Sequence, residues 1–164
     1  VVYISNHQSW LDIYVLLCLG VPLKFISKRE IFYIPLVGWV MGLIGHLSIS
    51  RGDRRSGKGV LDKCIEYVNK GVSVFFFPEG TRSRDGSTLS PFKIGAFKIA
   101  NDSGVPIVPI SIEGTSELMP RNKNFWLDQD KGSIKITVHD WIIPDNNLTT
   151  VQLRDKAFEL LNGE

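Results

Sequence analysis

The sequence predicts an α/β domain in which helices flank a mostly parallel central sheet. Two runs, 72–77 (VSVFFF) and 107–112 (IVPISI), have the apolar, β-branched character of buried strands, and each follows a segment with helical spacing. Alternating strands and helices are typical of parallel sheets, whose carboxyl ends carry the loops that form sites. We therefore expect a single domain over residues 1–164, a length sufficient for a hydrophobic core.

The first half of the chain follows this alternation. In order, we expect a strand over 1–5, a helix over 10–19, a short strand over 25–27, a short helix near Pro35, a buried strand over 46–50 and a helix over 57–70. Gly20 and Pro22 end the first helix. Leu61, Cys64 and Val68 recur at helical spacing, so the last helix is amphipathic.

The second half continues the pattern. After the buried strand 72–77, we expect a helix over 94–102, a buried strand over 107–112, a half-exposed strand over 134–138 near the sheet edge and a helix from Thr150 to about Leu161. Gly104 closes the first of these helices, and residues 149–152 (TTVQ) have the spacing of a capping box at the start of the last one.

Composition excludes several classes of protein. The chain is 43% hydrophobic and 22% charged, which is too apolar for a disordered segment. A formal net charge of +2 does not favour binding to nucleic acid, and no nucleic-acid partner is expected. Cys18 and Cys64 lie in apolar helical patterns without CxxC spacing, so neither a disulfide framework nor a zinc site is predicted. A reducing compartment is the expectation.

Residues 31–50 form an uncharged run of the length that spans a bilayer. Pro35 and three glycines interrupt this run, so a short helix followed by a strand is favoured over a continuous lipid-facing helix. The chain begins at Val1 inside a predicted strand, and neither a signal nor a transit peptide pattern precedes it. We expect a piece of a longer protein that lacks an N-terminal membrane segment.

The loop after the first strand combines a histidine with a carboxylate. In residues 6–12 (NHQSWLD), His7 stands five residues before Asp12. The carboxylate can hold one ring nitrogen of His7 while the other faces outward as a general base. The alternative is a histidine that caps a helix whose first turn contains Asp12.

Charged residues also follow the strongest strand. Residues 77–84 (FPEGTRSR) contain a glycine flanked by Glu79, Thr81 and Arg82. Backbone N–H groups and a guanidinium at such a strand end suit an anion such as phosphate. Arg51 supplies another guanidinium after the third strand. A surface turn with a Glu79–Arg82 ion pair, or a solvated Arg51, is the alternative.

Four segments together resemble the glycerolipid acyltransferases, in particular the bacterial and plastid-type 1-acyl-sn-glycerol-3-phosphate (lysophosphatidic acid) acyltransferases. The first and third signature blocks are similar to 6–12 and 77–83, the second to 45–51 (GHLSISR) and the fourth to 105–110 (VPIVPI). Order and spacing match over residues 2–117. Ser50 departs from the acidic residue that precedes the arginine in many relatives.

The resemblance implies direct acyl transfer from a thioester to the sn-2 hydroxyl of lysophosphatidic acid, which gives phosphatidic acid. It implies His7 as the base, Asp12 as its partner and Lys28 as an oxyanion-stabilising group. It assigns acceptor binding to Arg51, Glu79, Gly80, Thr81 and Arg82. No metal or resident cofactor is implied, and coenzyme A or acyl carrier protein brings the acyl group. A cytoplasmic or stromal membrane face is the expected location.

Other interpretations remain open. The acceptor can instead be glycerol 3-phosphate or another lysophospholipid, and a non-catalytic lipid-binding module is a second alternative. Residues 52–59 (GDRRSGKG) resemble a P-loop but end in Gly59, where a hydroxyl would hold Mg²⁺. Lys93 is interpreted as a solvated lysine rather than an anion ligand, and His46 and His139 as structural or exposed.

A membrane surface is the last expected partner, because the lipid substrate and product partition into bilayers. Residues 31–43 contain Phe32, Tyr33, Trp39 and Met41 among aliphatic residues, and a basic cluster follows them. The cluster consists of Arg51, Arg54, Arg55 and Lys58. This combination is typical of an interfacial patch next to anionic lipid, and its alternative is a buried core segment.

Overall fold

The computed structural model describes residues 1–49, 54–86, 88–120, 132–145 and 147–163, without the side chains of Val37 and residues 54–56. The six strands are β1 (Val2–Ser5), β2 (Leu23–Lys28), β3 (Leu47–Ile49), β4 (Ser73–Phe76), β5 (Ile107–Glu113) and β6 (Lys135–Val138). The helices are α1 (Leu11–Leu17), the 3₁₀ helix η1 (Arg29–Tyr33), α2 (Val37–Leu43), α3 (Arg54–Asn69), α4 (Gly95–Ser103), α5 (Thr115–Leu118) and α6 (Thr150–Asn162).

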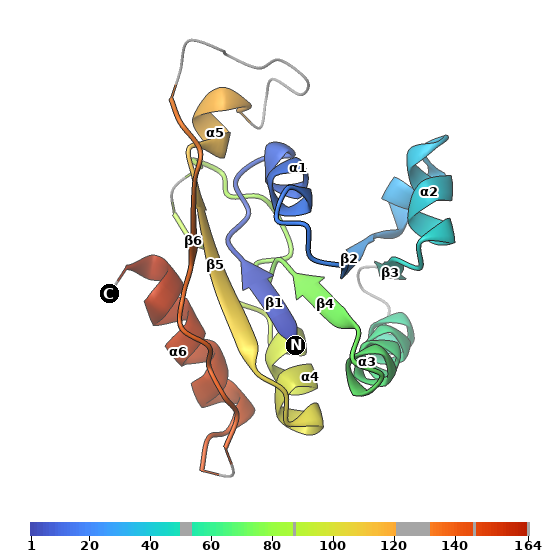
Figure 1. Ribbon diagram of the computed structural model, residues 1–164, viewed down its shortest axis with the longest axis vertical. Coiled ribbons are helices and arrows are strands. Elements are labelled where there is room, and N and C mark those ends of the chain that lie inside the picture. The colour runs from blue at the N-terminus through green and yellow to red at the C-terminus, as the bar shows by residue number, and fades with distance from the viewer. Residues whose placement is uncertain (50–53, 87, 121–131, 146, 164) are drawn as a thin grey trace.

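The described strands form one twisted sheet in the order β3-β2-β4-β1-β5-β6 (Figure 1). Every pairing in it is parallel except that of β5 with β6. The predicted fold class, a mostly parallel sheet flanked by helices, is therefore confirmed. Because β1 lies between β4 and β5, the loops that follow these three strands meet at one edge of the sheet.

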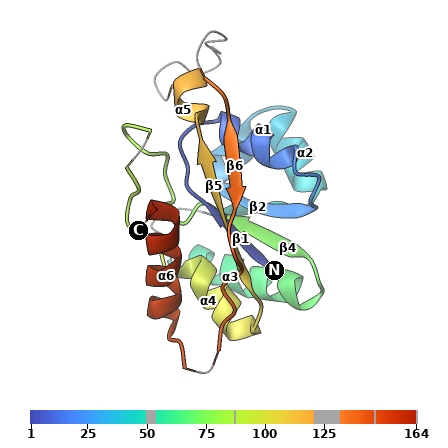
Figure 2. The same cartoon turned by 60° about the vertical axis from the view of Figure 1, so that its left-hand side comes forward.

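Two hydrophobic clusters cover the two faces of the sheet. One face packs against α3, α4 and α6, with Val2, Val74 and Ile107 among its fully buried strand residues. The other packs against α1 through Leu16, together with Phe75 and Ile110. Figure 2 shows α4 and α6 on one side of the strands and α1 on the other. Neighbouring strand residues thus point to opposite cores, as expected for strands buried on both faces.

Most predicted elements are present with shifted ends. The helix expected over 10–19 is shorter, at Leu11–Leu17, and Gly20 adopts a positive φ of 67° just beyond it. Thr149 caps α6 with the predicted capping box, because its side chain accepts from the backbone of Gln152 while the Gln152 side chain accepts in return. The edge position of the strand expected over 134–138 is confirmed by β6.

Three local features differ from expectation. The strand expected to be buried over 46–50, of which Ser50 lies outside the described residues, is the edge strand β3, in which Leu47 is buried but Ser48 is exposed. An edge strand has a neighbour on one side only, and here its middle residue faces outward. The elements η1 and α5 were not predicted, because 3₁₀ and single-turn helices are too short to show a hydrophobic period.

Candidate functional site

His7 and Asp12 form a close pair at the carboxyl end of β1. The His7 Nδ1 atom lies 2.8 Å from Asp12 Oδ2, and the Asp12 side chain is fully buried while that of His7 is 15% exposed. An ionised carboxylate has no proton to donate, so Nδ1 carries the hydrogen. The lone pair is therefore on Nε2, which is the arrangement that a general base requires.

The imidazole of His7 is also held from the side. Its ring stacks on Phe77, with ring centroids 3.9 Å apart and an interplanar angle of 16°. Phe77 follows β4, the parallel neighbour of β1. Stacking and the Nδ1 hydrogen bond together leave the ring little rotational freedom. Contacts within the protein thus fix the orientation of the imidazole.

The carboxylate of Asp12 accepts from several donors besides His7. The backbone N–H groups of Gln8 and Ser9 donate to Oδ2 at 2.7 and 2.9 Å. The hydroxyl of Thr115 donates to Oδ1 at 2.5 Å. Buried carboxylates need such donors, because desolvation without them is costly. Asp12 therefore lies in the first turn of α1 but is fully buried and bonded to the loop that precedes this helix.

Glu79 connects three segments of the chain from a buried position, with 3% of its surface exposed. Its Oε1 accepts from the backbone N–H of His7 at 2.9 Å, and its Oε2 accepts from that of Ser90 at 2.9 Å. Burial raises the pKa of the Glu79 carboxyl, and the two backbone N–H donors partly oppose that rise. These contacts give Glu79 a positioning role, and its contact with substrate stays a prediction.

The same loop clamps the backbone of His7 from its other side. The Ser83 N–H donates to the His7 carbonyl at 2.7 Å, so Glu79 and Ser83 together engage both backbone polar groups of His7. Asn6 is held as firmly, because its carboxamide exchanges two hydrogen bonds of 2.8 Å with the backbone of Ile112 in β5. These contacts thus tie the histidine and the residue before it to β5 and to the loop that follows β4.

Gly80 and Arg82 lie in the turn between these contacts. Gly80 has a φ of 70°, which favours glycine, and its N–H donates to the Phe77 carbonyl at 2.9 Å. The Arg82 guanidinium lies 5.3 Å from the ring centroid of Trp10, a cation–π distance, and Trp10 directly precedes α1. The turn therefore places a cation beside the loop that carries His7. Thr81, between the two, is half-buried.

Three further cations were considered from the sequence. Lys28 is the last residue of β2 and is exposed, but β4 separates β2 from β1, which places it about 10 Å from β1 across the sheet. Arg51 lies outside the described residues. Lys93, interpreted as a solvated lysine, is exposed yet lies against Gly80: a Cβ on that glycine would stand 2.4 Å from Lys93 Nζ. The structure thus adds Lys93 to the charges around the turn.

The remaining motifs have structural roles or lose support. His46 Nδ1 accepts from the Phe25 N–H at 3.1 Å, and His139 Nε2 lies 2.7 Å from the Ser111 hydroxyl, so both histidines are structural as predicted. The P-loop interpretation falls partly on residues 52 and 53, which are outside the described residues. Residues 54–59 of that motif already belong to α3, whereas a P-loop needs an open backbone before its helix.

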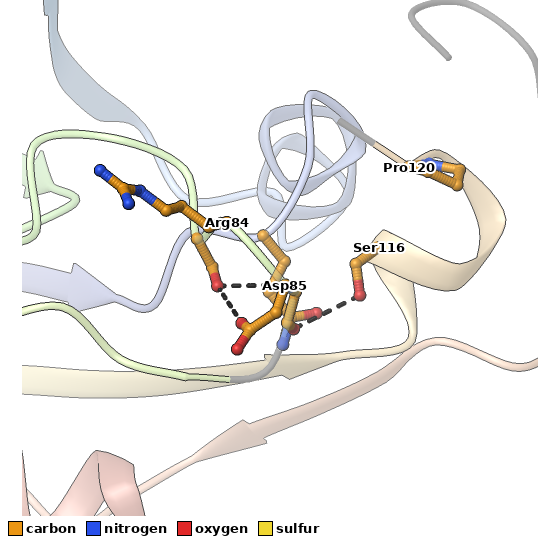
Figure 3. Close-up of a pocket in the computed structure, with 7 residues that line it drawn as sticks. Arg84, Asp85, Ser116 and Pro120 are labelled. Carbon is orange, nitrogen blue, oxygen red and sulfur yellow. Dashed lines mark hydrogen bonds between the residues drawn. The ribbon is translucent and has the colours of Figure 1, made fainter. Parts of the chain in front are cut away.

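A polar cavity of about 480 Å³ adjoins residues 6–10, between β1 and α1, which we call the histidine loop (Figure 3). It is lined by Gln8, Ser83, Arg84, Asp85, Gly86, Ser116 and Pro120. The Ser83 hydroxyl donates to Asp85 at 2.8 Å on one side, and the Ser116 hydroxyl donates to the Gly86 carbonyl at 3.4 Å on the other. Arg84 points away from Asp85 in this view. The cavity thus lies between the loops that follow β1, β4 and β5.

A second surface is apolar and is formed by η1, α2 and the residues around them. We call Tyr33, Leu36, Trp39, Val40, Leu43 and Ile44 the apolar surface. Leu36, Trp39 and Leu43 are 70%, 65% and 87% exposed. The alternative that this stretch is core is therefore wrong for these residues. Within the described part of the chain, no helix is both long and apolar enough to cross a membrane.

Curated proteins similar to this chain come from plants and bacteria. The chain is 49% identical over 162 residues to a chloroplastic 1-acyl-sn-glycerol-3-phosphate acyltransferase of Brassica napus, covering 98% of this chain and 46% of that protein. Its identity to the Escherichia coli enzyme of the same name is 36% over 124 residues, covering 74% of this chain and 50% of the bacterial protein. The chain thus spans about half the length of these relatives.

A solved structure agrees over nearly the whole chain. The crystal structure of the 1-acyl-sn-glycerophosphate (LPA) acyltransferase from Thermotoga maritima superposes with a TM-score of 0.83 at 32% identity, covering 99% of this chain and 63% of that one. The family model described as Acyltransferase matches residues 1–113, which contain β1 to β5 and both histidine and glutamate loops. This chain therefore belongs to the acyltransferase family.

Proposed function

We propose that this chain forms the catalytic unit of an enzyme that transfers a fatty acyl group from a thioester to the sn-2 hydroxyl of lysophosphatidic acid, giving phosphatidic acid. The observation that carries the proposal is the His7–Asp12 pair, in which Nδ1 lies 2.8 Å from an oxygen of a fully buried carboxylate. The names of the plant and bacterial relatives support the choice of acceptor.

In the proposed reaction, His7 transfers the proton and Asp12 stabilises the charged imidazole. His7 Nε2 takes the proton of the acceptor hydroxyl as its oxygen attacks the thioester carbonyl carbon. The resulting tetrahedral intermediate expels the thiolate when the carbon–sulfur bond breaks, and the imidazolium returns the proton to sulfur. Asp12 stabilises the imidazolium in between. The nucleophile belongs to the substrate, so the protein supplies a base and its partner without a nucleophilic side chain of its own.

The cations near the site are assigned to substrate. Arg82 is proposed to bind the acceptor phosphate with the turn residues Glu79, Gly80 and Thr81, and Arg51 to add a second contact. The position of Arg82 beside Trp10 supports its part in this assignment. Lys28 is proposed to stabilise the oxyanion with its long exposed side chain. No resident metal or cofactor takes part in this scheme, and coenzyme A or acyl carrier protein enters with the acyl group as substrate.

The apolar surface is proposed to contact the membrane in which acceptor and product reside. Exposed tryptophan, tyrosine and leucine side chains on a short helix suit the boundary between headgroups and acyl chains. Lys58 is exposed, and together with Arg51, Arg54 and Arg55 it would attract anionic lipid. Chloroplastic and bacterial relatives support a plastid or bacterial setting, and we propose the stromal or cytoplasmic membrane face.

The test is a product assay with the purified protein and defined substrates. Lysophosphatidic acid is supplied with acyl-coenzyme A or with acyl carrier protein thioesters, and mass spectrometry follows phosphatidic acid. Parallel reactions contain glycerol 3-phosphate or lysophosphatidylcholine as acceptor. We expect product from lysophosphatidic acid and little from the others. A preference for another acceptor would replace the proposed substrate, and no transfer to any acceptor by folded protein would favour a lipid-binding module.

A further inference from the structure

We infer that Thr115 is a positioning residue for the reaction, because its hydroxyl orients Asp12 and thereby selects the tautomer of His7. The inference rests on the proposed function. Thr115 is fully buried, and its Oγ1 donates to Asp12 Oδ1 at 2.5 Å. It lies beyond residues 1–113, where the match to the family model ends. Neither the sequence motifs nor that match assigns it a role.

The hydrogen bonds to Asp12 are divided between its two oxygens. Oδ2 accepts from His7 Nδ1 and from the N–H groups of Gln8 and Ser9. Oδ1 accepts from the Thr115 hydroxyl, which approaches from a different part of the chain. The donors to Oδ2 all belong to residues 7–9, in the loop just before the helix that contains Asp12. Thr115, which follows β5, therefore fixes the orientation of the Asp12 carboxylate plane relative to the sheet.

A second acceptor competes weakly for the same hydroxyl. Gln8 Oε1 lies 3.3 Å from Thr115 Oγ1, compared with 2.5 Å for Asp12 Oδ1. A hydroxyl has one proton, and a charged acceptor at shorter range forms the stronger bond. The proton of Thr115 is consequently directed at Asp12.

The chain turn after β5 places Thr115 at this point. Gly114 precedes it with a φ of 84°, and a Cβ there would stand 2.1 Å from the Ser133 carbonyl oxygen, so glycine is required. This turn starts α5 at Thr115. At the other end of α5, the Met119 carbonyl accepts from the Ser9 hydroxyl at 2.7 Å. The segment 115–119 thus contacts the His7–Asp12 loop at two places.

Loss of the hydroxyl has a defined chemical consequence. Oδ1 would be buried without this donor, and the carboxylate would turn to recover a partner. The bond from Oδ2 to His7 Nδ1 would then lengthen, and the ring proton would divide between Nδ1 and Nε2. A proton on Nε2 removes the base, so catalysis falls while substrate binding is retained.

The experiment compares Thr115→Val, which keeps the shape, with Thr115→Ser, which keeps the hydroxyl. We expect Thr115→Val to lower kcat about 10- to 100-fold, which is the loss typical of removing a residue that orients a functional side chain through a hydrogen bond. The KM should stay within about twofold. Thr115→Ser should recover most of the rate. Thr137→Val, in β6, is the matched control and should behave as wild type.

A measurement independent of activity separates this inference from the proposed function. The ¹⁵N shifts of the His7 imidazole report which nitrogen is protonated. We expect Nδ1–H in the wild type and in Thr115→Ser, and a mixture of tautomers in Thr115→Val. A wild-type tautomer in folded Thr115→Val would overturn the inference even if no acyl transfer were found. Equal loss of kcat in both variants would also overturn it, because the hydroxyl would then not matter. If Thr115→Val does not fold, failure of Thr115→Ser to show the wild-type tautomer decides against the inference.

Discussion

The histidine loop follows β1 and the apolar surface follows β2, two parallel strands that β4 separates in the sheet, and the two regions are built in opposite ways. The histidine loop is held by buried polar groups from other segments: Asp12 and Thr115 are fully buried, and Glu79 nearly so. The apolar surface exposes hydrophobic groups, with Leu43 at 87%. In one region polar atoms are hidden from water, and in the other apolar atoms face it.

The difference distinguishes a region whose groups are satisfied within the chain from a region whose groups are suited to contact with another molecule. The buried carboxylates of Asp12 and Glu79 accept from donors within the chain, so the arrangement around His7 is held by the protein's own hydrogen bonds. A contiguous exposed apolar area marks a contact with something else. We therefore expect mutations in the histidine loop to change rate and stability, and mutations in the apolar surface to change binding to membranes.

The largest effect is expected from His7→Ala. Loss of a positioned base costs on the order of 10²–10⁴ in rate. The ring is 15% exposed and lies at the edge of the core, so the fold should persist. Phosphatidic acid formation and the far-UV circular dichroism spectrum are the measurements. Near-normal turnover by folded His7→Ala would remove the mechanism.

The next effect concerns stability rather than chemistry. Glu79→Gln offers one acceptor oxygen where two backbone N–H groups donate, those of His7 and Ser90. One buried donor loses its partner, which costs about 1–3 kcal/mol. Denaturant unfolding should show this loss, and Glu66→Gln, at an exposed glutamate of α3, should be near neutral. Unchanged unfolding in Glu79→Gln would contradict the bridging role of its carboxylate.

On the apolar surface, we expect substitutions to change membrane binding far more than the free energy of unfolding. The double variant Trp39→Ser/Leu43→Ser should reduce binding to anionic vesicles by about tenfold or more, because each side chain removed gives up apolar area that the bilayer would bury. The free energy of unfolding should change by no more than about 0.5 kcal/mol. Trp141→Ser is the matched control, since Trp141 is 58% exposed but follows β6 toward the opposite edge of the sheet. Equal vesicle binding by all three proteins would exclude the surface as the contact.

The smallest effect is expected from His46, near the apolar surface. Burial, and secondarily the charge of Lys24, lowers the pKa of His46 below its ordinary value of 6.5. A lowered pKa in the folded state means that stability is complete above about pH 6.5 and is lost as the pH falls through that value toward the folded pKa.

His46→Asn isolates this contribution, because its side-chain oxygen can still accept from the Phe25 N–H but does not titrate. Glu79 contributes with the opposite sign, since a raised carboxyl pKa favours the folded state as the pH falls. The relevant quantity is therefore the difference between wild type and His46→Asn. We expect the wild type to lose more stability between pH 7 and 5, and parallel curves would show that His46 has no such role.

The sequence was most informative where local chemistry repeats with a clear period. The strands β4 and β5 and the helix α3 follow from apolar runs and helical spacing, and the cap of α6 follows from four residues. Those patterns depend on neighbours along the chain. The close pairing of His7 with Asp12 was also predictable, because five residues of a loop and helix start can bring the two side chains together.

Contacts between distant segments had no comparable signal. Thr115 reaches Asp12 across 103 residues, and Glu79 reaches the His7 backbone across 72. One hint was present, since Thr115 follows a buried strand whose end was expected at the same edge as that of β1. Arg82 was predicted as a cation of the turn, but its position over Trp10 depends on how α1 packs.

By itself, the sequence determined the fold class, the end of the sheet at which the candidate site residues lie and the residue types available there. Each of these depends on local periodicity and on the direction of parallel strands. The tertiary structure alone decided which donors satisfy Asp12 and Glu79, how close Lys93 comes to Gly80 and that Trp39, Val40 and Leu43 of α2 are exposed. The physical reason is that hydrogen bonding and burial depend on which surfaces meet after the strands have paired, and strand order is not written in any one segment of the chain.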